Sequence, residues 1–439
     1  HLTDQIVSRL ARGRVYYGWF IVGVVLSGGI PRVGLNGSFF GIFLKPMSEE
    51  FGWSRAEMTW AVTIGTFIAA ALGVFLGRVL DRFGPRWMMA GGFTLLAVSY
   101  FGLATVSSLI GFYLIYAIGR STMQSATGHQ LMYALVSKWF VRRRAMAIST
   151  ATIGGYIGGI VLAPVTQTII NHFSWREAWV FFGVLTAFMG VVPAIIFLRR
   201  LPEDLSLLPD GDGRFRPTPG QAPALIEASL QRQQDEQRAD PAIGEDALNL
   251  KEALRTVSFW LLTVMVTVNT VGITGITFHM VPHFSDVGIS STAAAASVSF
   301  LTAGSIASVF LWGYLSDRVG AKRMLLIAVA TLWIASLLVA RTDTAMGAYV
   351  SSAVFGIGLA GTGLLSEVVW ADFFGRQYLG SIRGATIPFQ MIGNASGSLI
   401  AAFLYDLRGN YDDAFRFILV LYAVSMILLA IARRPTAKR

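Results

Sequence analysis

The sequence predicts an all-α polytopic membrane protein with twelve transmembrane helices. Three observations predict it: the composition, the length of the apolar runs and the basic residues between them. Of the 439 residues, 54% are hydrophobic and 14% are charged, whereas about 25% are charged in an ordinary soluble domain. The apolar residues form runs of about twenty or more, the length that crosses a hydrocarbon core about 30 Å thick. This composition excludes a soluble enzyme.

The first apolar run begins after Arg9, Arg12 and Arg14 and has the basic start of a signal peptide. It is too long for one, however, and no convincing cleavage site follows, so we expect a retained helix. The later runs are also long enough to span the membrane. The expected spans are 16 to 43, 57 to 79, 87 to 107, 110 to 137, 145 to 170, 177 to 198, 256 to 281, 292 to 315, 322 to 340, 345 to 371, 384 to 405 and 414 to 432.

The placement of Lys and Arg predicts the orientation of these helices. The formal net charge is +10, but the cations lie between apolar runs and not on one polar domain, so we expect no nucleic-acid partner. With a cytoplasmic N-terminus, most cations fall on the cytoplasmic side, as the positive-inside rule requires. We therefore expect a multi-pass protein of the cell (inner) membrane, in contact with the lipid bilayer, with both termini in the cytoplasm.

Two related halves follow one another along the chain. Residues 201 to 252 form a polar stretch, which we interpret as a cytoplasmic linker between an N-terminal bundle at 1 to 200 and a C-terminal bundle at 253 to 439. Its part from 224 to 238 could form an amphipathic helix or stay solvated. A charged loop recurs in both halves, which predicts two pseudo-symmetric six-helix bundles. The two copies are Gly77-Arg-Val-Leu-Asp81-Arg82-Phe-Gly84-Pro-Arg86 and Gly313-Tyr-Leu-Ser-Asp317-Arg318-Val-Gly320-Ala-Lys322.

With this loop after the second and the eighth span, the chain resembles the major facilitator superfamily. Three further motifs resemble bacterial monocarboxylate and oxalate/formate-type transporters: Tyr16-Tyr17-Gly18-Trp19, Lys138-Trp139-Phe140-Val141-Arg142-Arg143-Arg144, and the stretch from His279 to Ser290. The resemblance implies a monomeric secondary transporter that carries a small organic anion with a proton by alternating access. Organic anion exchange, proton-coupled efflux of amphipathic compounds and a non-transporting receptor remain as alternatives.

The repeated loop has a chemistry suited to gating. An aspartate beside arginines can pair with them and can face the N-terminus of a neighbouring helix. In the family that the chain resembles, this loop holds the two bundles together while the cytoplasmic side is closed. The resemblance therefore implies a gating role for Asp81, Arg82, Arg86, Asp317 and Arg318. The alternative is that these residues only determine topology.

Two arginines, Arg32 and Arg120, lie well inside predicted spans and away from the span ends, where a charge is costly unless it faces a cavity or a partner. Arg32 lies among glycines and beside Pro31, which predicts a broken or kinked helix, and such breaks often line the substrate cavity in transporters. It could instead pack against backbone carbonyls or reach outward. Arg120 resembles an arginine that proton-coupled members carry on the fourth helix, or it serves a structural network.

Four further polar residues complete the predicted substrate site. His129 occupies a place where similar transporters have a substrate-facing tyrosine, and the resemblance places His279 near the bound carboxylate. A neutral imidazole at His279 can donate a hydrogen bond and can also accept a transported proton. Tyr156 and Gln390 would supply hydrogen bonds and shape. We expect a central cavity at the interface of helices 1, 4, 5, 7, 8, 10 and 11.

Glu367 is the clearest acid inside a span. A carboxylate desolvated there could load and release a proton, which gives it a predicted coupling role together with His279. The alternative is a charge pair that closes the cytoplasmic side.

The chain departs from the resembled subfamily at two positions. Val309 stands where many monocarboxylate transporters carry a substrate-binding arginine, and the eleventh span offers Gln390 and Asn394 in place of a lysine. The charge partner of the substrate must therefore come from elsewhere, and Arg32 is the first candidate, with Arg120 second.

No cofactor or metal ion is expected. Gly356-Ile-Gly358-Leu-Ala-Gly361 has the spacing of a dinucleotide fingerprint, but no strand precedes it, and small residues within an apolar helix allow close helix packing. There is no Walker loop, and no cysteine is present to form a disulfide or a thiolate metal site. We therefore expect transport that is driven by an ion gradient.

Overall fold

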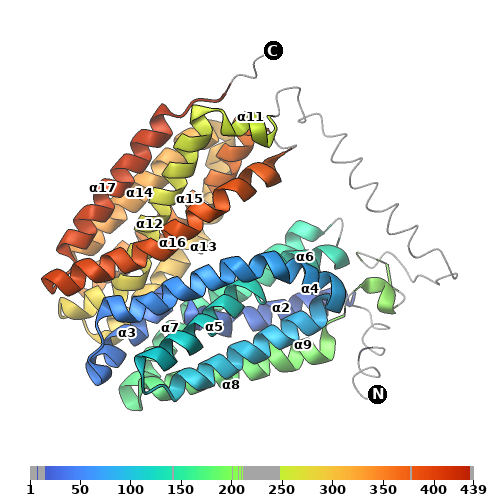
Figure 1. Cartoon of the computed structure of the whole chain (residues 1–439), viewed down its shortest axis with the longest axis horizontal. Coiled ribbons are helices and arrows are strands. Elements are labelled where there is room, and N and C mark those ends of the chain that lie inside the picture. The colour runs from blue at the N-terminus through green and yellow to red at the C-terminus, as the bar shows by residue number, and fades with distance from the viewer. Residues whose placement is uncertain are drawn as a thin grey trace. The chain divides into compact units, whose positions relative to one another are not determined.

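The computed structural model describes residues 15 to 140, 143 to 199, 248 to 375 and 378 to 435, together with residue 7 and most of 201 to 210. The described part is built of helices (Figure 1), and ten of them are long and apolar enough to cross a membrane. The predicted all-α polytopic fold class is thereby confirmed. The predicted amphipathic segment at 224 to 238 lies outside the described residues.

Packing contacts divide the chain into two compact units. Unit 1 contains His1–Leu35, Gly65–Gly158 and Phe173–Asp240, and unit 2 contains Asn36–Ile64, Gly159–His172 and Pro241–Arg439. Two helices therefore begin in one unit and end in the other: α4 (Arg55–Ala104) and α7 (Arg144–His172).

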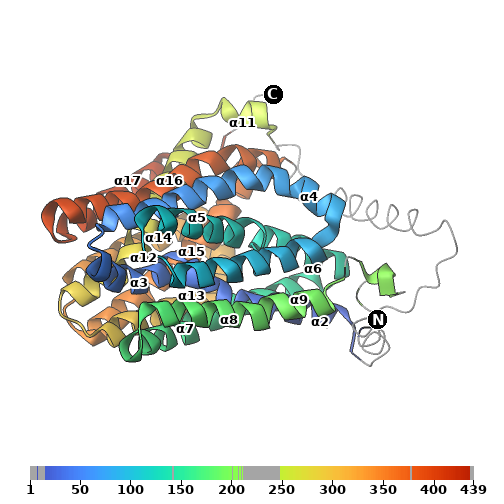
Figure 2. The same ribbon diagram turned by 60° about the horizontal axis from the view of Figure 1, so that its bottom comes forward.

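The later predicted spans correspond to helices of unit 2. Their bounds are α12 (Val257–Asp286), α13 (Ser291–Val319), α14 (Ala321–Arg341), α15 (Ala345–Phe374), α16 (Leu379–Arg408) and α17 (Asp412–Ile431). Unit 2 also contains α3 (Gly37–Phe51) and the short α11 (Leu250–Leu254), which begins with a capping box formed by Asn249 and Glu252. Figures 1 and 2 show α14 alongside α17 and α12 alongside α16, and these pairs are in contact.

Glycines on α15 allow its close packing against two neighbouring helices. A Cβ atom on Gly356 would lie 1.9 Å from the carbonyl oxygen of Leu301 on α13, and one on Gly358 would lie 2.9 Å from the backbone nitrogen of Leu332 on α14. The structure therefore agrees with the helix-packing interpretation of this glycine motif.

Unit 1 is formed from shorter helical pieces. These are α2 (Gly18–Gly29), the 3₁₀ turn η1 (Pro31–Leu35), α5 (Leu109–Ser125), α6 (His129–Trp139), α8 (Trp175–Thr186), the π turn η2 (Ala187–Val191) and α9 (Val192–Phe197). A further 3₁₀ turn, η3, covers Pro202–Leu205.

The tyrosines before α2 join two of the subfamily motifs in the core of unit 1. The Tyr16 hydroxyl donates to the Trp139 carbonyl at 2.9 Å, and the Tyr16 ring meets Phe140 edge to face, with centroids 5.5 Å apart. The Tyr17 hydroxyl donates to the Phe197 carbonyl at 2.7 Å. These motif residues therefore fix α2 against α6 and α9.

The structure differs from the predicted spans in the first half of the chain. The predicted break in the first span is confirmed, since α2, η1 and α3 replace one helix. The expected fourth span is also broken, between α5 and α6. The expected second and third spans are assigned to the single helix α4, and no helix break separates them at the charged loop.

Candidate functional site

Arg32 lies in η1, the broken part of the first span. Pro31 has no N–H to continue the helix, so the chain turns through η1 before α3 begins. The Nη1 of Arg32 donates to the carbonyl oxygen of Thr127 at 3.0 Å. Thr127 lies in the break of the fourth span, where a carbonyl has no helical partner. The Thr127 carbonyl in the break of the fourth span therefore accepts a hydrogen bond from Arg32 in the break of the first span.

Arg120 of the fourth span donates in turn to a carbonyl in the break of the first span. Its Nη1 donates to the carbonyl of Leu35, the last residue of η1, at 2.7 Å, and its Nε donates to the Thr66 hydroxyl at 3.2 Å. The side chain is 4% exposed. A buried guanidinium is costly without hydrogen-bond partners, and these partners make Arg120 a structural part of unit 1.

The fourth span breaks because of Gly128. A Cβ there would lie 1.9 Å from the Gln124 carbonyl oxygen. Gly128 has an extended conformation and precedes the first residue of α6. Arg120 therefore lies on α5, and His129 begins a separate helix.

A small cavity borders Arg32 in unit 1. Its volume is about 10 Å³, and its lining includes Gly29, Phe93, Thr127 and Thr152. This volume is close to the minimum that holds one water molecule. An organic anion does not fit it, so contact between Arg32 and an anion would require a different conformation.

A larger cavity lies within unit 2. Its volume is about 200 Å³, an order of magnitude more than one water molecule needs. The residues that give it chemistry come from α12, α15 and α16, and include Asn269, Thr270, Ser366, Glu367, Arg383 and Gln390.

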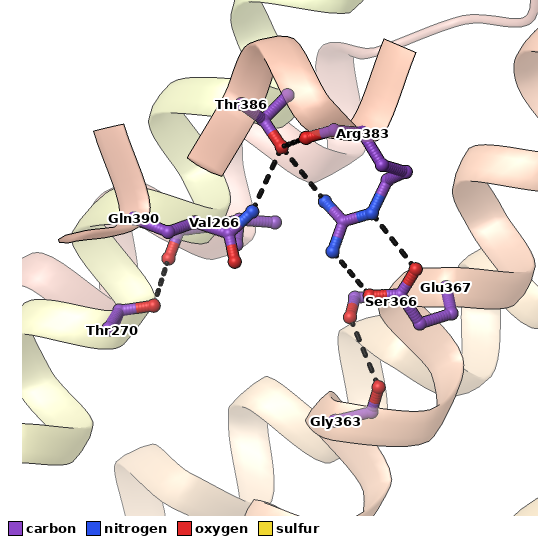
Figure 3. A network of polar contacts seen from close by, with 8 residues as sticks. All are labelled: Val266, Thr270, Gly363, Ser366, Glu367, Arg383, Thr386 and Gln390. Carbon is purple, nitrogen blue, oxygen red and sulfur yellow. Dashed lines mark hydrogen bonds and ion pairs between the residues drawn. The ribbon is translucent and has the colours of Figure 1, made fainter. Parts of the chain in front are cut away.

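An ion pair between Arg383 and Glu367 borders this cavity (Figure 3). The Nε of Arg383 donates to Oε2 of Glu367 at 2.9 Å, and Nη2 contacts Oε1, so the pair is bidentate. The Arg383 side chain is 18% exposed and that of Glu367 is 55% exposed. Glu367 therefore forms a charge pair, which the sequence left as the alternative to proton transfer.

Gln390 belongs to the same network. Its amide donates to the Thr386 hydroxyl at 3.0 Å, and Nη1 of Arg383 donates to the same oxygen at 3.2 Å. Asn269 adds an acceptor, because its Oδ1 is buried and has no hydrogen-bond partner within the described part of the chain. The cavity thus offers a cation, a carboxylate and two amides.

His279 lies elsewhere in unit 2 and is fully buried. Its Nε2 is 2.8 Å from the Ser398 carbonyl, and its Nδ1 is 2.9 Å from the Tyr411 hydroxyl. Both ring nitrogens are therefore engaged, and contact with a substrate would require a change in these bonds. Tyr156 is exposed on α7, while the side chain of His129 lies outside the described residues.

The predicted gating residues are described in part. The side chains of Asp81 and Arg82 lie outside the described residues. Arg86 donates from Nη2 to the Ile195 carbonyl at 2.8 Å. In the second copy, Asp317 is exposed and the Arg318 guanidinium lies 4.3 Å from the centre of the Tyr314 ring. Their gating role stays a prediction.

Metal-binding chemistry receives no support from the described side chains. No group of three or more His, Asp or Glu residues among them could hold a metal ion. His283, one turn after His279, has its Nε2 3.1 Å from the Val339 carbonyl.

The membrane-spanning helices, the broken spans and the charged groups within them are typical of a polytopic membrane transporter. The chain belongs to the Major Facilitator Superfamily, whose sequence model matches residues 33–386 and 273–439. The resemblance seen in the charged loops is thereby confirmed.

Several named relatives are similar to most of the chain. The chain is 28% identical over 404 residues to Monocarboxylate transporter 12 of Mus musculus, and the match covers 89% of this chain and 80% of that protein. It is 25% identical over 388 residues to Monocarboxylate transporter 13 of Bos taurus, covering 86% and 80%. An MFS-type transporter of Bacillus subtilis, YcxA, is 22% identical over 406 residues and is covered to 90%, as is this chain.

Solved structures support the fold. The xylose transporter XylE from E. coli superposes with a TM-score of 0.68 at 13% identity, covering 96% of each chain. The nucleoside transporter NupG gives a TM-score of 0.66 at 14% identity, covering 95% of this chain and 98% of that one.

Arg383 was not among the predicted site residues. The eleventh span was expected to begin at 384, which placed Arg383 in a cytoplasmic loop. The helix begins at Leu379, which places Arg383 on α16 and beside the cavity. Its position one turn before Thr386 and two turns before Gln390 was the available signal.

Proposed function

We propose that this transporter carries a small organic anion of the monocarboxylate kind together with a proton, by alternating access. The observation that carries the proposal is the cavity of about 200 Å³ in unit 2, bordered by the Arg383–Glu367 pair. Arginine suits this task, because its planar guanidinium binds a carboxylate through two hydrogen bonds. The names of the relatives point to the same substrate class.

The anion exchanges with Glu367 as the partner of Arg383. Protonation neutralises the Glu367 carboxylate and weakens its bond to Arg383, so a substrate carboxylate can take its place. The half-exposed position of Glu367 supports this exchange, since water and substrate can reach it. Gln390 and Asn269 then orient the polar groups of the substrate.

Apart from Arg120, the residues predicted from the sequence keep their proposed roles. Arg32 is the proposed anion contact in unit 1, with Arg120 supporting the backbone beside it. Both already donate to carbonyl groups, so an anion at Arg32 would replace or join a backbone contact. His129, Tyr156 and His279 are the proposed hydrogen-bonding groups, and His279 is the second proposed proton carrier.

The proposal also includes the setting of the protein. We place the chain as a monomer in the cell (inner) membrane with both termini in the cytoplasm. The distribution of Lys and Arg supports this orientation. The gating role of Asp81, Arg82, Arg86, Asp317 and Arg318 then falls on the cytoplasmic side.

Uptake into proteoliposomes tests the proposal. Labelled mono- and dicarboxylates are supplied with and without an inward proton gradient, to the parent chain and to Arg383→Gln, Arg32→Gln and Arg341→Gln. Arg341 is exposed at the end of α14 and serves as the control. We expect gradient-stimulated monocarboxylate uptake by the parent and the control, and loss of at least about tenfold in Arg383→Gln.

Other outcomes separate the alternatives. Uptake that needs an internal anion and ignores the gradient would indicate exchange. Extrusion of amphipathic dyes without carboxylate flux would indicate efflux, and no flux of either kind would favour a receptor. Full uptake by Arg383→Gln with loss in Arg32→Gln would return the anion site to unit 1.

A further inference from the structure

An ion pair between a buried arginine and a partly exposed aspartate lies at the start of α4, on the predicted outer side of the membrane. Arg55 is 6% exposed, and its Nη2 is 2.7 Å from Oδ2 of Asp286, the last residue of α12. Its guanidinium carbon lies 3.7 Å from the centre of the Tyr405 ring of α16. Loss of the partner of a buried charge is costly, so the burial of the Arg55 guanidinium favours keeping the start of α4 in place.

A chain of hydrogen bonds continues from Arg55 into unit 2. Arg55 Nη1 donates to the Tyr411 hydroxyl. Because the Ser398 carbonyl can only accept, His279 Nε2 donates to it at 2.8 Å, and in a neutral imidazole Nδ1 then accepts from Tyr411 at 2.9 Å. Burial raises the pKa of the Tyr411 phenol above its ordinary range, so the hydroxyl keeps the proton that this chain requires.

The backbone of α4 is fixed at the same place. The first helical N–H groups have no partner within their own helix. The carboxylate of Asp406, on α16, accepts from the backbone nitrogen of Arg55 at 3.1 Å and from that of Ala56 at 2.8 Å. Two turns further along α4, the Thr63 hydroxyl donates to the Ala395 carbonyl of α16 at 2.9 Å. The start of α4 is therefore held by side chain and backbone.

The contacts at the start of α4 lie on a helix that is shared between the two packing units. The start of α4 belongs to unit 2, but the helix continues into unit 1 after Ile64. The end of α7 behaves in the same way, since Asn171 Nδ2 donates to the Thr292 hydroxyl at the start of α13 at 3.1 Å. Segments from the N-terminal half of the sequence are thus attached to the C-terminal half at the predicted outer side.

We propose that Arg55, Asp286 and Tyr411 form an outer latch, which closes the predicted outer side and opens once in each transport cycle. The inference rests on the proposed alternating access and adds gating residues opposite the cytoplasmic loops. Release of Arg55 from Asp286 and Tyr411 weakens the attachment, and once the Arg55 and Ala56 N–H groups also leave Asp406, the start of α4 moves away from α12 and α16 and exposes the surface around Thr63. His279 acts as a positioning residue, because it holds the hydroxyl of Tyr411.

Cysteine labelling tests the latch without any substrate. The chain has no cysteine, so Thr63→Cys provides a single thiol at a position that is 4% exposed. A membrane-impermeant maleimide is added to the outside of cells that express the full chain. We expect slow labelling of Thr63→Cys alone, and labelling about tenfold faster when Arg55→Gln, Asp286→Asn or Tyr411→Phe is added. Thr63→Cys with Arg341→Gln is the matched control and should label slowly.

Further controls distinguish opening of the latch from misfolding as the cause of faster labelling. Each is first checked by size-exclusion chromatography in detergent, and Asp286→Asn and Tyr411→Phe stand in for Arg55→Gln if that variant does not fold, because they keep the shape of the side chain. Labelling of all folded latch variants at the control rate would overturn the latch. Because labelling needs no transported anion, faster labelling with no carboxylate uptake would support the latch and reject the proposed substrate.

Discussion

Three arginine side chains of this protein differ in their burial and in the groups that they contact. Arg120 is buried and donates to the Leu35 carbonyl and the Thr66 hydroxyl, whereas Arg55 is buried and pairs with a carboxylate. Arg383 pairs with a half-exposed carboxylate beside a cavity. The first two guanidinium groups are buried, so loss of their partners is costly, and we propose that the third exchanges its partner for a ligand carboxylate.

Glu367→Gln tests the coupling role at this scale. Glutamine resembles the protonated acid, so we expect carboxylate uptake to persist but the stimulation by a proton gradient to disappear. The measurement is the ratio of initial uptake rates with and without the gradient. Asp372→Asn is the control, because Asp372 is an exposed acid on the same helix. A ratio in Glu367→Gln equal to that of the control would exclude Glu367 as a proton carrier.

Arg120→Met tests the structural role of the buried guanidinium. It leaves the Leu35 carbonyl with only the 3.5 Å contact from the Tyr116 hydroxyl, and a fully unsatisfied buried polar group costs about 1 to 3 kcal/mol. We expect a lower midpoint of thermal unfolding in detergent, with a smaller loss in Arg120→Lys and no change in Arg341→Gln. An unchanged midpoint in Arg120→Met would show that the contact contributes little to stability.

The breaks within helices show what could be predicted from the sequence. The break in the first span was predictable, because Pro31 among glycines removes a donor and weakens the helix. The break in the fourth span was not predictable, because no proline marks it. The requirement for glycine at 128 becomes visible only from the close approach of the Gln124 carbonyl oxygen in the structure. The Arg383–Glu367 pair joins two helices, and the sequence gives no direct measure of such contacts.

Gly356 tests helix packing at the same scale. Gly356→Ala places a Cβ 1.9 Å from a backbone oxygen of α13, so α13 and α15 must move apart. Overpacking of this kind typically costs about 1 to 3 kcal/mol, and we expect a lower unfolding midpoint. Gly363→Ala is the matched control on α15, because a Cβ there meets open space. Equal midpoints for the two variants would contradict the packing argument.

At the scale of the whole molecule, the two units defined by packing do not have the same residue bounds as the two halves predicted from the sequence repeat. The duplicated loops and the polar linker predict halves at 1 to 200 and 253 to 439. Packing in this structure places 36 to 64 and 159 to 172 with the C-terminal half. Sequence repeats report ancestry of the bundles, while packing reports the contacts of one conformation, so the repeats did not predict these attachments.

The shared helices have a consequence for a chain expressed as two polypeptides that are divided within the linker. The C-terminal fragment alone would lack α3 and the start of α4, so the α12 surface that contacts α3 would be uncovered. We expect this fragment to be degraded or aggregated when it is made alone, and to be rescued when the N-terminal fragment is co-expressed. The measurement is the yield of monodisperse fragment in each case, and equal yields would contradict the expectation. In such a protein, each fragment would act as the folding partner of the other.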